Sequence, residues 1–98
     1  MKREMALTKL RALESELRVR GVQRLFLFGS VANDSALDTS DVDLFFEDDP
    51  DRPLGVFAVM GVEQFISDKL GVEVDLIPKD SLHVLLKDDI VASAQAVY

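Results

Sequence analysis

Residues 25–30 read Leu-Phe-Leu-Phe-Gly-Ser, and after ten intervening residues the chain continues Asp41-Val42-Asp43-Leu44. The first stretch is an apolar run of strand length that ends in a glycine-serine turn. The two aspartates open a second apolar run, and a third aspartate lies within Val74-Asp75-Leu76-Ile77. Carboxylates set into apolar strands are costly unless they are paired or bound to a cation. The pattern therefore predicts two or three strands that carry a charged site.

The composition is that of a folded protein of modest size. The chain has 98 residues, of which 48% are hydrophobic and 30% charged, and it contains no cysteine. We expect a single domain over residues 1–98, without disulfides or thiolate metal sites. No apolar run reaches the roughly 18–20 residues of a membrane span, so we expect a cytoplasmic protein that binds no membrane. The formal net charge of −7 argues against direct binding of nucleic acid, because phosphates are bound by Lys and Arg.

Hydrophobic spacing predicts the remaining elements. Leucines recur every three or four residues over 4–19, which predicts an amphipathic helix. Strands are predicted at 22–28, 41–46 and 72–77, with a polar connection and a short helical turn over 29–40. A second long helix is predicted over 54–70, with Val56 and Met60 on its apolar face. A last amphipathic helix is predicted over the tail from Leu82 to Val97, with Leu85 and Leu86 on its apolar face. The order α-β-α-β-α-β-α indicates a mixed α/β (α+β) fold, with a small mixed sheet of about three strands packed with helices.

The spacing of the aspartates suggests a chemistry. Side chains two residues apart on a strand point to the same face, so Asp41 and Asp43 lie about 6.5–7 Å apart on one side. Asp75 joins them if its strand is adjacent. Oxygen-only ligands suit Mg²⁺, which is commonly bound through carboxylates and substrate phosphates. Gly29 allows close backbone approach, and exposed N–H groups and the Ser30 hydroxyl can bind phosphate. We therefore expect a site for Mg²⁺, with two ions, and a nucleoside triphosphate.

These segments resemble the nucleotidyltransferase superfamily typified by DNA polymerase β, and more closely the minimal nucleotidyltransferase (MNT) group. The resemblance rests on 25–30, on Ser40-Asp41-Val42-Asp43-Leu44 and on 74–77, and it covers nearly the whole chain. It implies a polymerase-β-type fold and a Mg²⁺-dependent nucleotidyltransferase that uses ATP. In that family pattern Asp41, Asp43 and Asp75 are the catalytic metal ligands. Asp75 is also the base, and Gly29 and Ser30 hold the β- and γ-phosphates.

The resemblance also implies a partner. Members of the MNT group are typically antitoxins that form hetero-oligomers with a HEPN-domain ribonuclease toxin and transfer AMP from ATP to a toxin tyrosine. One alternative is a weakly active or inactive module that neutralises the toxin by occlusion. It is motivated by Asn33-Asp34, which replace a basic residue and glycine that many relatives carry. Arg24, Arg52, Lys79 and Lys87 are the basic residues that could substitute for it as phosphate ligands. A further alternative is nucleotidyl transfer to a small molecule.

Overall fold

The computed structural model describes residues 1–35 and 41–98, so part of the predicted polar connection, residues 36–40, lies outside the described residues. The helices are α1 (Arg3–Arg11), α2 (Glu14–Val19), α3 (Gly29–Ala32), α4 (Val56–Leu70) and α5 (Lys87–Ser93), with a 3₁₀ turn η1 (Lys79–Ser81). The strands are β1 (Arg24–Phe28), β2 (Val42–Glu47), β3 (Val74–Pro78) and β4 (Gln95–Ala96). The predicted mixed α+β fold is confirmed. None of the helices in the described ranges has the length and apolar character needed to cross a bilayer.

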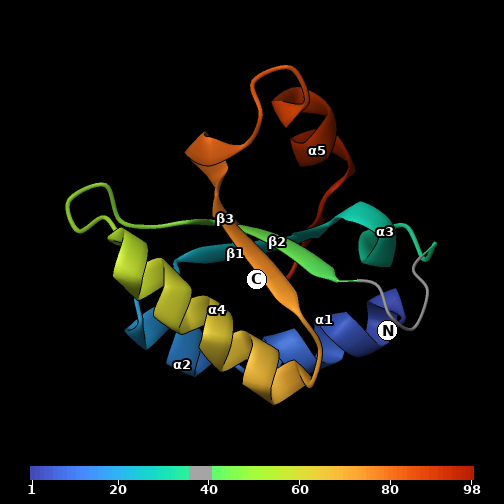
Figure 1. Cartoon of the computed structure of the whole chain (residues 1–98), viewed down its shortest axis with the longest axis horizontal. Coiled ribbons are helices and arrows are strands. Elements are labelled where there is room, and N and C mark those ends of the chain that lie inside the picture. The colour runs from blue at the N-terminus through green and yellow to red at the C-terminus, as the bar shows by residue number, and fades with distance from the viewer. Residues whose placement is uncertain (36–40) are drawn as a thin grey trace.

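The strands form one sheet in the order β3-β2-β1-β4. β1 pairs antiparallel with β2 and with β4, whereas β2 and β3 run parallel. A parallel pair needs a long crossover connection, and α4 supplies it between β2 and β3 (Figure 1). β2 therefore occupies an interior position between β1 and β3, and the segment that begins Asp41-Val42-Asp43 enters the middle of the sheet.

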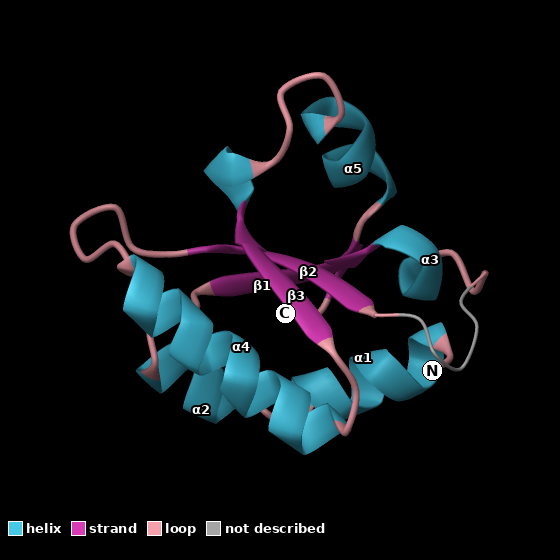
Figure 2. Ribbon diagram, viewed as in Figure 1, coloured by secondary structure: helices cyan, strands magenta, loops and turns pink. Residues whose placement is uncertain are grey.

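The two faces of the sheet have different surroundings. Helices α1, α2 and α4 lie along one side of the sheet, and α5 stands on the other side (Figures 1 and 2). Alternate strand residues face the three helices and form the main core with Leu10, Leu17 and Ile66. The strand residues of this core are Leu25, Leu27, Val42, Leu44, Phe46, Val74 and Leu76. Their alternation is the period-two pattern that the sequence displays.

The opposite face carries a smaller aromatic group. The rings of Phe26 and Phe45 are stacked with centroids 4.7 Å apart, and Phe28 lies tilted against Phe45 at 5.7 Å. Phe45 is only 1% exposed. These three residues come from neighbouring strands and fill the sheet surface next to Asp43. They form a packed apolar layer on the second face of the sheet.

Several predicted elements differ in detail from the observed ones. The helix expected over 4–19 is divided at Ala12–Leu13, where the Leu13 N–H donates to the Leu10 carbonyl and tightens the turn. The tail contains a shorter helix than expected and adds β4, a two-residue strand that the sequence pattern does not predict. Val56, Met60, Leu85 and Leu86, which the periodicity assigns to core faces, are exposed. Apolar spacing alone does not tell whether a packing partner is present.

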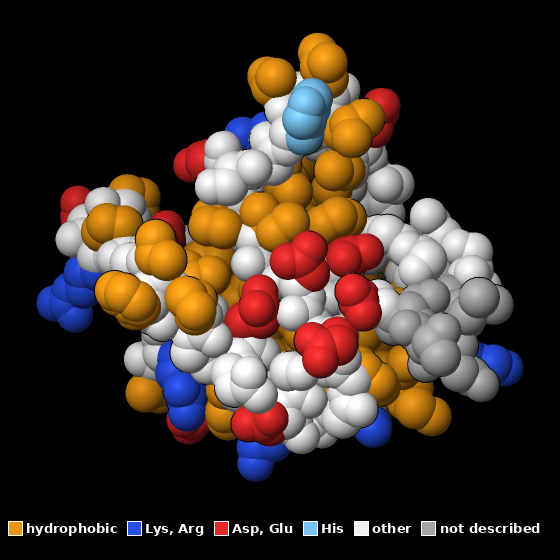
Figure 3. Space-filling view, in the orientation of Figure 1, with side chains coloured by type: hydrophobic (Ala, Val, Ile, Leu, Met, Phe, Trp, Pro, Cys, Tyr) orange, Lys and Arg blue, Asp and Glu red, His pale blue; other side chains and the backbone are white. Residues whose placement is uncertain are grey.

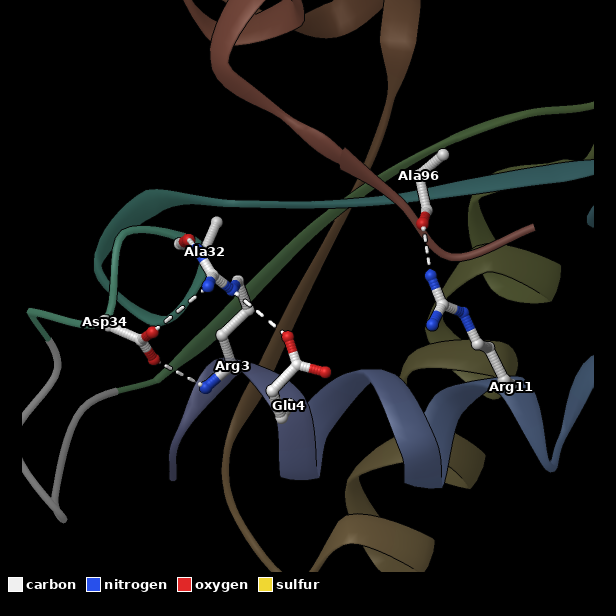
Figure 4. Close-up of polar contacts among 6 residues, drawn as sticks. All are labelled: Arg3, Glu4, Arg11, Ala32, Asp34 and Ala96. Atoms are coloured by element: carbon white, nitrogen blue, oxygen red, sulfur yellow. Dashed lines mark hydrogen bonds and ion pairs between the residues drawn. The ribbon is translucent and has the colours of Figure 1, made fainter.

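The end of the described chain is anchored to the body by side chains from α1 and α2. Arg11 donates to the carbonyls of Ala96 and Val97 at 3.1 and 2.9 Å, and Figure 4 shows the contact with Ala96. The Tyr98 hydroxyl donates to the carbonyl of Val22 at 2.8 Å, and the Arg18 guanidinium lies 4.7 Å from the Tyr98 ring centroid. Burial raises the pKa of Tyr98 from 10.0 to about 12. These contacts hold β4 against β1.

Tyr98→Phe tests this anchor. The substitution leaves the Val22 carbonyl without the phenol donor, and we expect it to lower the free energy of unfolding by about 1 kcal/mol in urea titrations. Above pH 10.0 the unfolded chain loses the phenol proton first, because the folded-state pKa is about 12. Wild-type stability from this group therefore falls over that interval, and the variant lacks that decline. Tyr98 is the only tyrosine, so an unchanged midpoint and an unchanged alkaline slope would contradict the anchor.

Candidate functional site

The turn between β1 and α3 is built around Gly29. Its φ of +76° lies in the left-handed region that glycine adopts without strain. A Cβ at this position would also overlap Oδ2 of Asp43, which comes from the neighbouring strand β2. Two separate constraints therefore require glycine here. The second constraint places the Asp43 carboxylate directly against the backbone of the turn that precedes Ser30.

The sheet register brings two of the predicted acids side by side. Asp43 is the partner of Phe28 across the antiparallel pair and of Asp75 across the parallel pair. Register partners on adjacent strands lie about 5 Å apart and point to the same face. Asp43 and Asp75 therefore share the face opposite the main core. Asp43 is half-buried and Asp75 is exposed.

Asp41 lies immediately before β2 and is exposed. Burial raises the pKa of Asp43 above its ordinary value of 3.8, and the negative charges of Asp75 and then Asp41 raise that pKa further. Asp43 is thus destabilised as an anion by its surroundings and by both of the other predicted acids. A bound cation would relieve this repulsion, and carboxylate oxygen is the donor that Mg²⁺ prefers. The three side chains therefore fit a magnesium site by donor chemistry.

The side chains of Asp41, Asp43 and Asp75 are not arranged as a complete set of metal ligands. Within residues 1–35 and 41–98, no group of three or more His, Asp or Glu side chains is close enough to hold a metal ion. Asp43 and Asp75 are brought together by the register, and Asp41 acts on Asp43 through its charge. The metal-ligand role of these residues stays a prediction. So does phosphate binding by Gly29 and Ser30.

The basic residues that the sequence offers as phosphate ligands lie elsewhere. Lys79 pairs with Glu47 at 2.9 Å, and Arg24 is the register partner of Glu47 at the far end of β2. Glu47 is four positions after Asp43, which is about 13 Å of strand. Lys87 pairs with Asp80 at 3.3 Å, and the backbone of Arg52 pairs with that of Asp49 in the loop before α4. A hollow of about 500 Å³ at the far end of β2 is lined by Arg24, Lys79 and three prolines, and its lining does not include Asp41, Asp43 or Asp75.

The contact between Arg3 and Asp34 is one that sequence reasoning missed. Asp34, which has a φ of +55°, accepts a hydrogen bond from the Arg3 backbone N–H at 2.9 Å. Its other oxygen lies 3.5 Å from the Arg3 guanidinium, which also donates to the carbonyl of Ala32 at 3.3 Å (Figure 4). Asp34 thus caps the start of α1, and the Arg3 charge offsets its own. The extra negative charge that the sequence places after the Gly-Ser turn is paired, and no local sequence signal links residues 31 positions apart.

Comparison with known proteins identifies the class. The family model described as "Nucleotidyltransferase domain" matches residues 8–97, and the chain belongs to this family. A relative from Methanocaldococcus jannaschii named "Putative protein adenylyltransferase" is 37% identical over 62 residues, which are 63% of this chain and 61% of the relative. The matched region is thus less than two thirds of that relative's length.

Solved structures share the fold. A "putative minimal nucleotidyltransferase" is 26% identical with a TM-score of 0.81, and the match covers 97% of this chain and 95% of that one. A second structure is a tri-AMPylated HEPN toxin from Shewanella oneidensis in complex with its MNT antitoxin. It is 21% identical with a TM-score of 0.69, over 98% of this chain and 71% of that one. At that identity the second likeness shows the fold alone. The expected polymerase-β-type nucleotidyltransferase fold is confirmed.

Gly29→Ala tests the contact between the turn and Asp43. Gly71 provides a matched control, because its φ is +75° and a Cβ there would meet nothing within 4 Å. Gly71→Ala should cost only the backbone strain, roughly 1–2 kcal/mol. Gly29→Ala should cost more, since Asp43 must also move, and the difference in urea midpoints measures that displacement. Equal losses in the two variants would show that Asp43 does not need the empty Cβ position.

Asp43→Asn tests the electrostatic cost of the site. Because the folded-state pKa of Asp43 is raised, its ionisation disfavours the folded chain at neutral pH, and this penalty disappears as pH falls through 3.8. The variant should therefore have the higher thermal midpoint at neutral pH without divalent cations, and the difference should vanish in acid. Added Mg²⁺ should raise the midpoint of the wild type more than that of the variant. Asp51→Asn, in the exposed loop before α4, should behave like wild type in all three measurements.

Proposed function

We propose that this chain is a Mg²⁺-dependent nucleotidyltransferase that moves AMP from ATP to a hydroxyl of a partner protein. The partner is a HEPN-type ribonuclease toxin, the acceptor is a tyrosine, and the modification neutralises the toxin. The observation that carries the proposal is the register pair of Asp43 and Asp75, with the Asp43 carboxylate seated against the Gly29 turn. Family membership supports the reaction class. The similarity to a protein named as an adenylyltransferase and to the AMPylated toxin complex supports a protein acceptor.

Each residue has a distinct task in this proposal. Asp41, Asp43 and Asp75 hold Mg²⁺, and the turn at Gly29 and Ser30 binds the β- and γ-phosphates through backbone N–H groups and the serine hydroxyl. Asp75, which is more exposed than its register partner Asp43, takes the proton from the acceptor hydroxyl. The hydroxyl oxygen bonds to the α-phosphorus, the bond from that phosphorus to the bridging oxygen breaks, and pyrophosphate leaves. Bound Mg²⁺ supplies charge neutralisation for the triphosphate.

The open setting of the aspartates supports a protein acceptor. Asp41 and Asp75 are exposed, so the surface of another protein can reach them. A small acceptor needs a concave pocket that surrounds it. A protein acceptor brings its own surface and closes the site from outside, and the exposed carboxylates are accessible to it.

The direct test measures transfer of labelled AMP. The chain is incubated with ATP labelled at the α-phosphate, Mg²⁺ and the HEPN-type protein encoded beside its gene, and label on the partner is followed by mass spectrometry. Asp43→Asn and Asp75→Asn should each lower the rate by roughly 100-fold or more, since each removes an anionic ligand of the proposed Mg²⁺ and Asp75→Asn also removes the base. Asp51→Asn should retain the wild-type rate.

The same experiment separates enzymatic neutralisation from occlusion. If the partner's ribonuclease activity is blocked without ATP, and equally well by Asp43→Asn and Asp75→Asn, the chain acts by occlusion. Neutralisation that needs ATP and fails in both variants supports transfer. Unchanged labelling by the two variants would reject the assigned roles.

A further inference from the structure

We infer that two exposed apolar patches beside the aspartates form the docking surface for the acceptor protein, which presents apolar side chains around at least one basic residue. This inference rests on the proposed function and adds the surface and the chemistry of the partner. The α4 patch consists of Val56, Phe57 and Met60, and the loop patch, between η1 and α5, consists of Val84, Leu85 and Leu86. Phe57 is 87% exposed and Leu85 is 81% exposed.

The α4 patch is not an outer part of the core. The core face of α4 is formed by Val62, Ile66 and Leu70, which are at most 4% exposed. Phe57, Met60 and Gly61 follow one another at helical spacing on a different face. A Cβ on Gly61 would meet nothing within 4 Å, so this face is open and flat at its centre. Large apolar side chains around a glycine allow a partner to approach the helix closely.

The loop patch is presented by local hydrogen bonds and not by burial. The Leu86 N–H donates to the His83 carbonyl at 2.9 Å, and the Leu85 N–H donates to Nδ1 of His83 at 3.2 Å. Only Leu82 of this segment is buried, and α5, which follows it, has no buried residue. Three consecutive large apolar residues are thus held outward in a defined conformation. Such an arrangement marks a surface that another protein covers.

Both patches are seen from the same side of the molecule, together with a group of acidic side chains (Figure 3). Figure 3 shows hydrophobic side chains over the start of α4 and over the segment between η1 and α5, with acidic side chains gathered near the centre of the same view. In the ribbon of the same orientation, β2 and β3 cross this central region (Figure 1). A protein that covers both patches therefore also covers the central region where β2 and β3, the strands that carry Asp43 and Asp75, cross (Figures 1 and 3). That is the position from which an acceptor hydroxyl reaches the proposed site.

Charge decides between a partner protein and a second copy of this chain. The chain has 18 acidic and 11 basic residues and a formal net charge of −7. Acidic side chains gather between the two patches in Figure 3, and a second copy would set these acids against its own. Like charges brought together at an interface cost binding free energy, whereas a basic partner gains it. The occupant is therefore a different protein whose contact surface is apolar and positively charged.

The test measures affinity for the HEPN-type protein by calorimetry, separately from transfer. Met60→Ser and Leu85→Ser each remove one apolar anchor and should weaken binding about 10-fold or more. Met5→Ser is the matched control, because Met5 is 54% exposed on α1 and Met60 is 58% exposed on α4. All three variants should keep the wild-type thermal midpoint and the wild-type affinity for ATP. Wild-type affinity should fall as salt is raised, because screening weakens attraction between opposite charges.

The outcomes distinguish this inference from the proposed function. Wild-type affinity in Met60→Ser and Leu85→Ser, or no binding by the wild type, overturns the docking surface. Binding that is lost in both variants, without any AMP transfer by the wild type, supports the surface and rejects the proposed reaction. A wild-type homodimer that both variants dissociate would make a second copy the occupant and overturn the charge argument.

Discussion

The missing side chain of Gly29 is the constraint on which the candidate site depends. The Asp43 carboxylate lies so close to Gly29 that a Cβ there would overlap its Oδ2. The turn after β1 and the carboxylate on β2 are therefore fitted to each other, and neither can change without moving the other. The antiparallel register of β1 with β2 aligns Phe28 with Asp43, and the parallel register of β2 with β3 adds Asp75. The contact between Gly29 and Asp43 and these two registers thus bring together three segments that are distant in sequence.

The fold accepts an electrostatic cost to form this arrangement. Partial burial and two neighbouring carboxylates all raise the pKa of Asp43. The opposite face of the sheet supplies the compensating stability, since its strand residues pack against α1, α2 and α4 in the main core. The stacked rings of Phe26 and Phe45 support the charged face itself. Repulsion that persists in an otherwise well-packed protein is typical of sites that act on a ligand.

Sequence patterns predicted the parts of the structure that depend on local chemistry. The strands, and the opposite orientations of Val42 and Asp43 on β2, follow from period-two alternation. The turn after β1 follows from the glycine at its start. Arg3 was missed because its partner Asp34 is 31 residues away, and β4 was missed because two residues give no period. The extent of the core was overestimated at Met60 and Leu85. Helical spacing shows which side chains share a face, but not whether anything covers that face.

The exposed apolar residues and the open aspartates have a common physical explanation. An enzyme that encloses a small substrate gathers its apolar surface inside a pocket and excludes water by itself. In this chain Asp41 and Asp75 are exposed, and large apolar side chains are exposed as well. The acceptor protein would complete the site, because its surface removes water from the aspartates while it covers the α4 patch and the loop patch. Binding energy from those remote patches can then orient the acceptor hydroxyl, which couples recognition of the partner to the chemical step.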